Sequence, residues 1–297
     1  MRNIVRRLRR PLVLLAAAAV CGGLAPLARA DDGRVSLRVS NSWSRISPRE
    51  LNDYLEDYVR SYEDIYGVGI SRNSTKTFDW AQDFEIAVDI PLRRGLVLTA
   101  SAGLLSSSRE GNAFTVEWGT ESDAFLRDDR IRSVAVELGL GYVMPLSGRF
   151  GLRPHFGLDA YWSTFEDSGS QTRSYSSWGD LVTAWTANAH AFNLGGTAGV
   201  TLDGNVFGGL GLFLDAGYRM ARLSNFSGRY EESNEGVSDG AVDFSLLYFE
   251  ETVDWLDTSY KRFNLPGGWS GGNVTLVHSA VIDLSGFYFK AGLRVSF

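Results

Sequence analysis

Hydrophobic and polar residues alternate over the last twelve positions of the chain, residues 286–297. The apolar positions are Phe287, Phe289, Ala291, Leu293, Val295 and Phe297. The positions between them are small or polar and include Lys290 and Arg294. A period of two predicts a β-strand with one apolar and one polar face. Such a strand suits a barrel wall with lipid outside and a polar interior, and the edge strand of a soluble sandwich is the alternative.

The same period recurs in seven earlier segments, which predict seven further strands. They begin near residues 35, 80, 96, 133, 150, 192 and 210. Their connections alternate between short turns, at 92–95, 145–148 and 203–205, and long polar segments. We expect the serine-rich residues 166–186 to form one of these long loops. Short turns at one rim and long loops at the other are typical of outer-membrane barrels.

Three tryptophans fall at the loop-side ends of the predicted strands, namely Trp43, Trp80 and Trp162. Transmembrane barrels carry aromatic residues where the apolar band meets the lipid headgroups. We therefore expect these three side chains to form an outer aromatic girdle.

One segment changes to a helical period. Ser47 and Glu50 form a capping box, with Pro48 at the first helical position. Apolar residues then recur at helical spacing, so we expect an amphipathic helix over 48–66 that ends at Gly67. It falls in the first long loop. We expect its apolar face to pack on the barrel mouth, and docking of a surface partner is the alternative.

The first thirty residues combine a basic start, an apolar core and the small residues Ala28 and Ala30. This order predicts a secretory signal peptide at 1–30, which leaves residues 31–297 as the barrel. The single cysteine, Cys21, lies within that leader, so we expect no disulfide in the mature chain.

The terminal strand that ends in Phe297 resembles the assembly signal of bacterial outer-membrane β-barrels. The resemblance implies that the barrel assembly machinery reads Phe287, Phe289, Leu293, Val295 and Phe297. With this strand the count is eight, and the architecture resembles small barrels of the OmpX and OmpA-membrane-domain type. We therefore predict an all-β fold, a closed antiparallel transmembrane β-barrel in the outer membrane of a Gram-negative cell envelope.

Residues 223–285 are too long for an ordinary loop and hold two apolar runs, at 244–249 and 274–282. We expect an outer loop with its own hairpin above the membrane. Two additional membrane strands, which would give ten in all, are the alternative.

Assigning the apolar positions to lipid places eleven charged residues on the inward face. They are Arg38, Asp83, Glu85, Asp89, Glu137, Arg153, Asp159, Asp215, Arg219, Lys290 and Arg294. An eight-stranded barrel is only wide enough for side chains to fill, and buried charges persist when they are paired. We call these residues the interior charge network and expect salt bridges to plug the lumen. In the alternative, several of the charges lie at wet rims and stay unpaired.

Charge narrows the range of partners. Removing the six arginines of the leader from the 29 basic residues leaves 23 against 35 acids, a net charge of −12. This excess argues against nucleic acid as a partner. We expect contacts with outer-membrane lipid and lipopolysaccharide, whose phosphates could share divalent cations with the acidic outer loops. The pattern indicates no catalytic, cofactor-binding or metal-binding residues.

Three histidines are the candidates for lipid-acting chemistry. His155 has inward parity, His190 has outward parity near the outer rim, and His278 precedes Ser279. The segment around His190 lacks the serine that the phospholipase-like pattern His-x-Ser-Asn requires. We therefore predict a structural or surface-interaction role. A small-solute channel of the porin type is the first alternative, and a lipid-modifying enzyme is the second.

Overall fold

The computed structural model describes residues 34–66, 70–175, 179–235, 237–253, 256, 258–263 and 273–297. The predicted signal peptide and Gly67 lie outside these residues. The described residues are mostly β-strand, with one α-helix, α2 (Arg49–Tyr66), and a short 3-10 turn, η2 (Arg93–Gly95).

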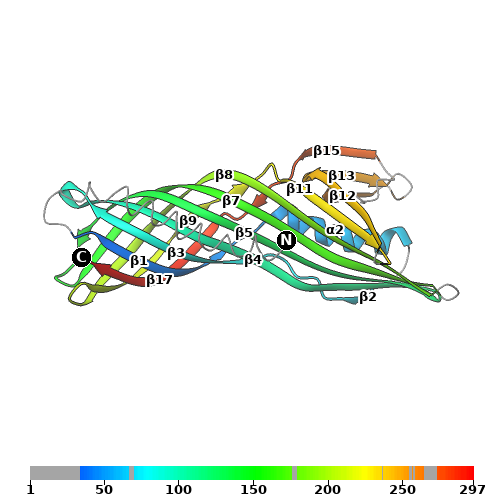
Figure 1. The fold of residues 1–297 in the computed structure, drawn as a ribbon, viewed down its shortest axis with the longest axis horizontal. Helices are drawn as coiled ribbons and strands as arrows, with labels where there is room; N and C mark the ends of the chain where they lie inside the picture. Colours follow the sequence, from blue (N-terminus) through cyan, green and yellow to red (C-terminus); the bar gives the residue numbers. More distant parts are fainter. Residues whose placement is uncertain are drawn as a thin grey trace.

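Eight antiparallel strands pair in sequence and return to the first, so that they form a ring (Figure 1). In order they are β1 (Ser36–Arg45), β3 (Trp80–Pro91), β4 (Leu96–Trp118), β5 (Glu121–Tyr142), β7 (Phe150–Tyr175), β8 (Gly179–Phe207), β9 (Leu210–Met220) and β17 (Gly286–Ser296). The ring closes where Leu37 of β1 lies opposite Val295 of β17. None of the described residues between 223 and 285 adds a strand to this ring.

Short turns join the ring strands at one end. In η2, Arg94 adopts a φ of 60° and Gly95 a φ of 79°, which reverses the chain between β3 and β4. The two-residue strand β6 (Met144–Pro145) precedes the turn into β7. The third turn was predicted at 203–205, which is wrong, because β8 stays paired as far as Phe207. Gly208, with a φ of 55°, makes that turn instead.

Four of the ring strands are about twice as long as the others. Strands β1, β3, β9 and β17 have 10 to 12 residues, whereas β4, β5, β7 and β8 have 22 to 29. The long strands continue beyond the ring at the end opposite the turns (Figure 1). The loop predicted at 166–186 is therefore wrong, because Ser174 of β7 pairs with Asp180 of β8. We call this part of the four strands, with the elements packed on it, the extension.

Shorter elements complete the extension. They are β2 (Ile70–Asn73), β10 (Arg222–Leu223), β11 (Ser227–Asn234), β12 (Val237–Ser245), β13 (Leu247–Val253), β14 (Thr258–Phe263), β15 (Asn273–Ser279) and β16 (Ile282–Asp283). Strand β2 pairs with β4, and the β11–β12 hairpin pairs with β8, so the sheet is open between β2 and β12. Strands β14, β13 and β15 form a separate sheet. The predicted hairpin in residues 223–285 is thus present as β11–β12.

Helix α2 lies in the extension, between the long strands and the β13–β15 sheet (Figure 1). Leu51, Leu55 and Val59 are buried, which places its apolar stripe on the protein interior. Its acidic side contacts β14, where Lys261 donates a hydrogen bond to Asp53 at 2.6 Å. No helix among the described residues is long and apolar enough to span a membrane.

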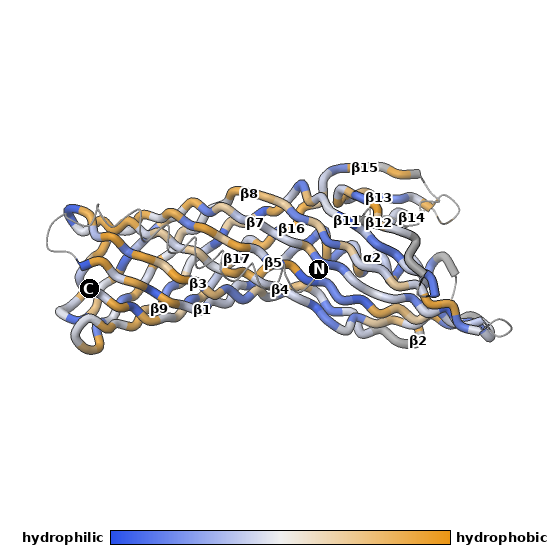
Figure 2. Tube along the Cα trace, viewed as in Figure 1, coloured by the Kyte–Doolittle hydropathy of each residue, from blue (hydrophilic) through white to orange (hydrophobic). Residues whose placement is uncertain are grey.

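Side chains alternate between the two faces of the ring as their sequence parity predicts. On β17, Phe287 is 74% exposed on the outer face, whereas Lys290 is 6% exposed inside. The outward face of the ring collects exposed Phe, Leu, Val and Trp side chains from all eight strands. Along the chain trace, hydrophobic positions recur on the ring and become sparser in the extension (Figure 2).

The outward face of the long strands changes polarity between two adjacent rows of side chains. One row across β4, β5, β7 and β8 consists of Leu104, Val134, Trp162 and Phe192. The next outward row, two residues further from the turns, consists of Ser106, Arg132, Thr164 and His190. The apolar outer face therefore ends at a sharp boundary where the extension begins.

Candidate functional site: the closed interior of the ring

A three-residue cluster lies toward the turn end of the lumen. The carboxylate of Asp89 lies 3.0 Å from Arg38 and 2.8 Å from Arg153, and Thr99 also donates to it. All of these groups are buried. Because a carboxylate can accept from several donors, one acid neutralises part of the charge of two guanidinium groups here.

Two further ion pairs cross the middle of the lumen. Lys290 lies 2.7 Å from Glu85, and Arg219 lies 2.8 Å from Asp83. Lys290 lies on β17, which is separated from β3 by β1, and Arg219 lies on β9, the next strand after β17. All four side chains are buried. Removing one partner would leave an uncompensated buried charge, so these pairs stabilise the ring across the junction of β1 and β17.

The turn-side rim of the lumen contains an acid, Asp203, in a segment that was predicted to form a turn. Asp203 lies 3.2 Å from Arg294 and 3.9 Å from Arg153. Its inward orientation follows from the longer β8, in which residue 203 has inward parity. The predicted turn at 203–205 concealed this signal.

Three acidic residues of the interior charge network form no ion pair with an arginine or lysine among the described residues. Asp215 is bonded to His155 at 3.0 Å, and Asp159 accepts a hydrogen bond of 3.0 Å from Tyr161. Glu137 forms no ion pair with a basic side chain among the described residues. The Glu137 side chain lies over Gly139 and Gly157. A Cβ atom added at Gly139 would lie 2.9 Å from its carboxylate oxygen, and one added at Gly157 would lie 2.6 Å from it.

An apolar cluster spans the lumen at the end opposite the turns. Every ring strand, or the residue next to it, contributes a side chain, as Ile46 does after β1, Leu105 in β4 and Leu284 before β17. Helix α2 adds Leu51 and Leu55 from above. We call this cluster the apolar plug. Its buried members are Ile46, Leu51, Tyr54, Leu55, Phe78, Ala81, Leu105, Ile131, Tyr161, Phe165, Ala187, Ala189, Ala221, Leu223, Phe226, Tyr230, Phe244, Leu246, Tyr248, Ala280, Ile282 and Leu284.

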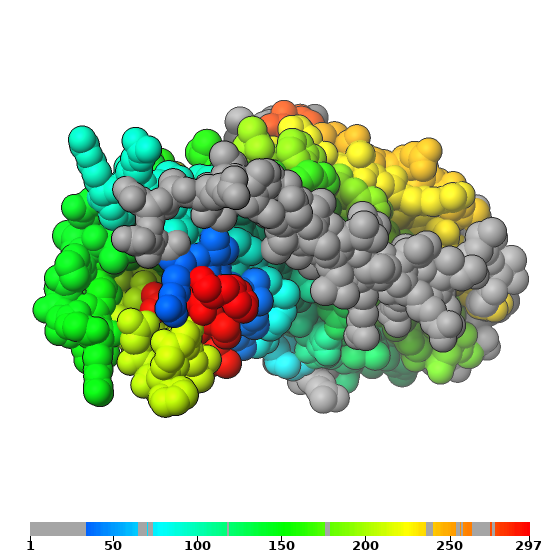
Figure 3. All heavy atoms as spheres, turned by 60° about the vertical axis from the view of Figure 1, so that its left-hand side comes forward, coloured from blue at the N-terminus to red at the C-terminus, as the bar shows by residue number. Residues whose placement is uncertain are grey.

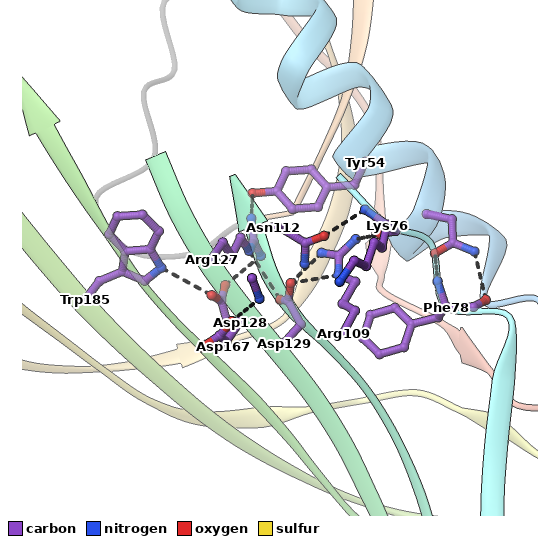
Figure 4. Close-up of polar contacts among 12 residues, drawn as sticks. Tyr54, Lys76, Phe78, Arg109, Asn112, Arg127, Asp128, Asp129, Asp167 and Trp185 are labelled. Atoms are coloured by element: carbon purple, nitrogen blue, oxygen red, sulfur yellow. Dashed lines mark hydrogen bonds and ion pairs between the residues drawn. The ribbon is translucent and has the colours of Figure 1, made fainter. Parts of the chain in front are cut away.

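Beyond the plug, a second charged cluster lies inside the extension (Figure 4). Arg127 contacts Asp129 at 3.2 Å and Asp167 at 2.6 Å, and it donates to the Tyr54 hydroxyl of α2 at 2.8 Å. Arg109 also donates to Asp129, at 2.9 Å from its Nε. These residues are not among the predicted sites, because their segments were expected to form loops.

Burial and charge shift the titration of this second cluster. Burial raises the pKa of Asp167 to about 6, although Arg127 opposes the shift. Burial alone would lower the pKa of Arg127, but Asp129 and Asp167 outweigh it and raise that pKa. A cavity of about 20 Å³ lies beside the cluster, lined by residues that include Tyr58 and Trp185. It is large enough for one water molecule and too small for a ligand.

The remaining predicted residues lie on the outer face. The girdle residues Trp43, Trp80 and Trp162 are exposed at the boundary end of the ring, and Trp162 packs on Phe192 with 5.2 Å between ring centroids. The predicted assembly residues are likewise exposed, at Phe287, Phe289, Leu293 and Val295 on β17 and at Phe297 just after it.

The other two histidines are far from the lumen. His190 Nδ1 lies 3.1 Å from the Thr164 hydroxyl on the outward boundary row, and His278 contacts the carbonyl of Ser279. Within the described ranges, no group of three or more His, Cys, Asp or Glu is arranged to hold a metal ion.

No family model and no curated protein matches the chain. Among solved structures, a major outer membrane protein from Thermus thermophilus is similar over 89% of this chain and 99% of that chain, with 11% identity and a TM-score of 0.38. The outer membrane protease OmpT from Escherichia coli is similar over 90% of this chain and 97% of that chain, with 11% identity and a TM-score of 0.28. At these scores, neither likeness decides what this chain does.

Proposed function

We propose that the protein is an eight-stranded outer-membrane β-barrel, closed to diffusion, that holds a folded extension at the cell surface. The observation that carries the proposal is the change of outward polarity between the two adjacent rows of the long strands. Exposed apolar side chains surround the whole ring, and a band of this extent is disfavoured in water. Lipid around the ring removes that cost, and the polar outward row marks where the lipid ends.

The lengths of the short ring strands support this position in the membrane. A tilted transmembrane strand needs about 9 to 11 residues. Strands β1, β9 and β17 have 10, 11 and 11 residues, and β3 has 12. The ring therefore matches one bilayer, and the extension, which begins at the polar row, lies in water. The leader predicted at 1–30 and the terminal Phe297 fit export and recognition by the barrel assembly machinery.

Two barriers in series support a closed lumen rather than a channel. The interior charge network fills the ring with ion pairs such as Lys290–Glu85 and Arg219–Asp83. Above it, the apolar plug excludes hydrated ions from the mouth. An open porin would need a continuous water-filled channel through both the charge network and the apolar plug. We therefore favour a structural or surface-interaction role, in which the extension is the part that meets partners.

Single-channel recording tests this function. The mature chain would be refolded into a planar bilayer, with insertion checked by a heat-dependent shift in gel mobility. We expect no steady conductance, because both barriers lie on the path along the lumen axis. A reproducible ohmic current from the inserted protein would contradict the closed lumen and would favour the small-solute channel.

A lipid-modifying enzyme is the second candidate, and one observation favours it. The Thr164 hydroxyl and His190 lie 3.1 Å apart in the polar outward row, where we place the end of the lipid. A hydroxyl beside an imidazole is the arrangement of an activated nucleophile. Incubating the refolded protein with labelled phospholipid or lipid A tests this role. Turnover that the His190→Ala variant abolishes would establish it, and no turnover by the wild type would reject it.

A further inference from the structure

The exposed charged side chains at the turn end of the ring, among the described residues, are all basic. Among the described residues there, in the three turns and just before β1, the exposed charged side chains are Arg34, Arg93, Arg94 and Arg149. Asp203 lies near this end, but it is buried and bonded to Arg294. Figure 3 shows this end of the molecule, with the three turns grouped around the first and last strands. An anionic surface would therefore meet four arginine side chains on the described part of this rim, where the carboxylate of Phe297 also lies.

A groove opens on the outward face next to one of these arginines. It has a volume of about 490 Å³ and runs across β8, β9 and β17. Its apolar walls come from Leu202, Leu212, Leu214 and Leu293, and its floor from the small residues Gly204, Ala291 and Gly292. Gly204 and Ala291 form the groove because they lack the bulk that their neighbours on the outward face present, whereas Gly292 faces the lumen and contributes its backbone.

Arg149 lies at the turn-side end of this groove. The next residue, Phe150, lines the groove and pairs with Gly204. The carbonyl of Arg149 accepts a hydrogen bond of 2.8 Å from the N–H of Asn205, which fixes the turn beside the end of β8. The Arg149 side chain is exposed and has no partner among the described residues. A cationic residue is therefore the chain neighbour of a residue that lines the apolar groove.

We infer that this groove and Arg149 form a binding site for an anionic phospholipid of the inner leaflet. An acyl chain lies against Leu212 and Leu293, and the phosphate lies at the Arg149 guanidinium. The inference rests on the proposed function, because the groove meets acyl chains only if the ring spans a membrane with its turns on the inner side. Charge complementarity selects an anionic lipid over a zwitterionic one, since each basic residue near an anionic surface strengthens binding about fivefold.

Native mass spectrometry of the refolded protein tests the site. The probes are dioleoylphosphatidylglycerol, dioleoylphosphatidylcholine and dioleoylphosphatidylethanolamine, each titrated into protein–detergent complexes. We expect the wild type to retain phosphatidylglycerol in preference to the other two lipids. The Arg149→Gln variant should lose about fivefold in apparent affinity for phosphatidylglycerol. Because Arg149 lies on an exposed turn, the gel-mobility shift should stay unchanged.

Matched variants separate this site from the general charge of the rim. Arg93→Gln makes the same charge change at the β3–β4 turn, across the ring from the groove. Because the effect of a charge on lipid binding falls off with distance, this variant should change the affinity for phosphatidylglycerol less than about twofold. Ala291→Leu fills the groove and should lower lipid retention, whereas Ala160→Leu adds the same bulk to the outward face of β7 and should not. Equal losses for Arg149→Gln and Arg93→Gln would overturn the site, as would equal retention of the three lipids.

Two further measurements identify the source of any failure. Competition with inorganic phosphate at millimolar concentration should leave the lipid bound, and displacement by phosphate would reduce the site to an anion site and overturn the inference. Flotation with vesicles tests the proposed function separately. A protein that floats but shows no lipid preference contradicts only the lipid site, whereas a protein that stays in the aqueous fraction contradicts the membrane-spanning ring itself.

Discussion

The carboxylate of Glu50, in the first turn of α2, accepts a hydrogen bond of 2.7 Å from the backbone N–H of Val281, 231 positions later in the chain. Val281 lies between Ala280 and Ile282, both of which are fully buried members of the apolar plug. The start of the helix is therefore fastened to the last connection before β17. This bond joins the first long connection of the ring to the last one, above the lumen.

Breaking that bond should loosen the plug locally. For Glu50→Ala, we expect amide hydrogen exchange at 280–284 to become about tenfold faster, because a hydrogen bond to a charged group contributes about 1.5 kcal/mol. Exchange followed by mass spectrometry measures this change. Glu56→Ala removes an exposed acid from the same helix and serves as the control. Equal exchange in the two variants would show that the Glu50 bond does not hold the plug.

The Lys290–Glu85 pair should be among the costliest contacts to break. Lys290→Met leaves Glu85 buried without its partner, and we expect a loss of about 3 to 5 kcal/mol in the free energy of unfolding. Adding Glu85→Gln to that variant should restore most of the loss. Urea titration of the inserted protein, followed by gel mobility, measures both. Glu137→Gln is the control, because Glu137 forms no ion pair among the described residues, and it should change the stability little.

The two barriers in the lumen should act independently. Replacing 49–66 with a Gly-Ser linker removes α2 from the plug, yet we expect the bilayer recording to stay silent because the charge network still fills the ring. Replacing Arg38, Asp89 and Arg153 with serine should also give no current while the plug remains. Combining the two changes should give steady conductance. A current through the helix-replaced variant alone would show that the charge network is not a barrier.

Asp167 should make the extension pH-sensitive. Burial raises its pKa from 3.8 to about 6, so the folded state binds a proton more tightly than the unfolded state. Stability from this group is therefore complete below about pH 4 and is lost as the pH rises through about 6, by at most about 3 kcal/mol. Urea unfolding followed by Trp fluorescence from about pH 4 to about pH 7.5 spans this window and measures the slope. Asp167→Asn should flatten it, and an unchanged slope would assign the dependence to another group.

The ring was predictable from sequence because its two faces differ in polarity. Outward residues are apolar and inward residues are small, polar or charged, which is why β17 and β3 could be located from periodicity alone. In the extension the outward face becomes polar, and the inward face carries both apolar and charged side chains. On β5, for example, Asp128 and Arg130 face water, whereas Ile131 and Arg127 face inward. The contrast between alternate positions is lost there, so the sequence predicts loops where the structure has paired strands.

The candidate site was predictable as a set of inward charges but not as a set of pairs. Parity identified both Glu85 and Lys290, but their contact joins positions 205 residues apart. Such a contact depends on ring closure and register, which one sequence does not specify. Asp203 was missed for a local reason, since the turn predicted at 203–205 removed it from the inward face.

Strands β4, β5, β7 and β8 run without a break from the ring into the extension. About thirteen residues of β4 lie beyond Leu105, which corresponds to roughly 40 Å along the strand. No linker separates the two parts along these four strands, so the backbone hydrogen bonds of one sheet carry any load from tip to base. The extension is therefore a rigid arm rather than a tethered domain. Whatever it contacts would be met at a fixed distance and angle, and a pull on its tip would act directly on the barrel wall.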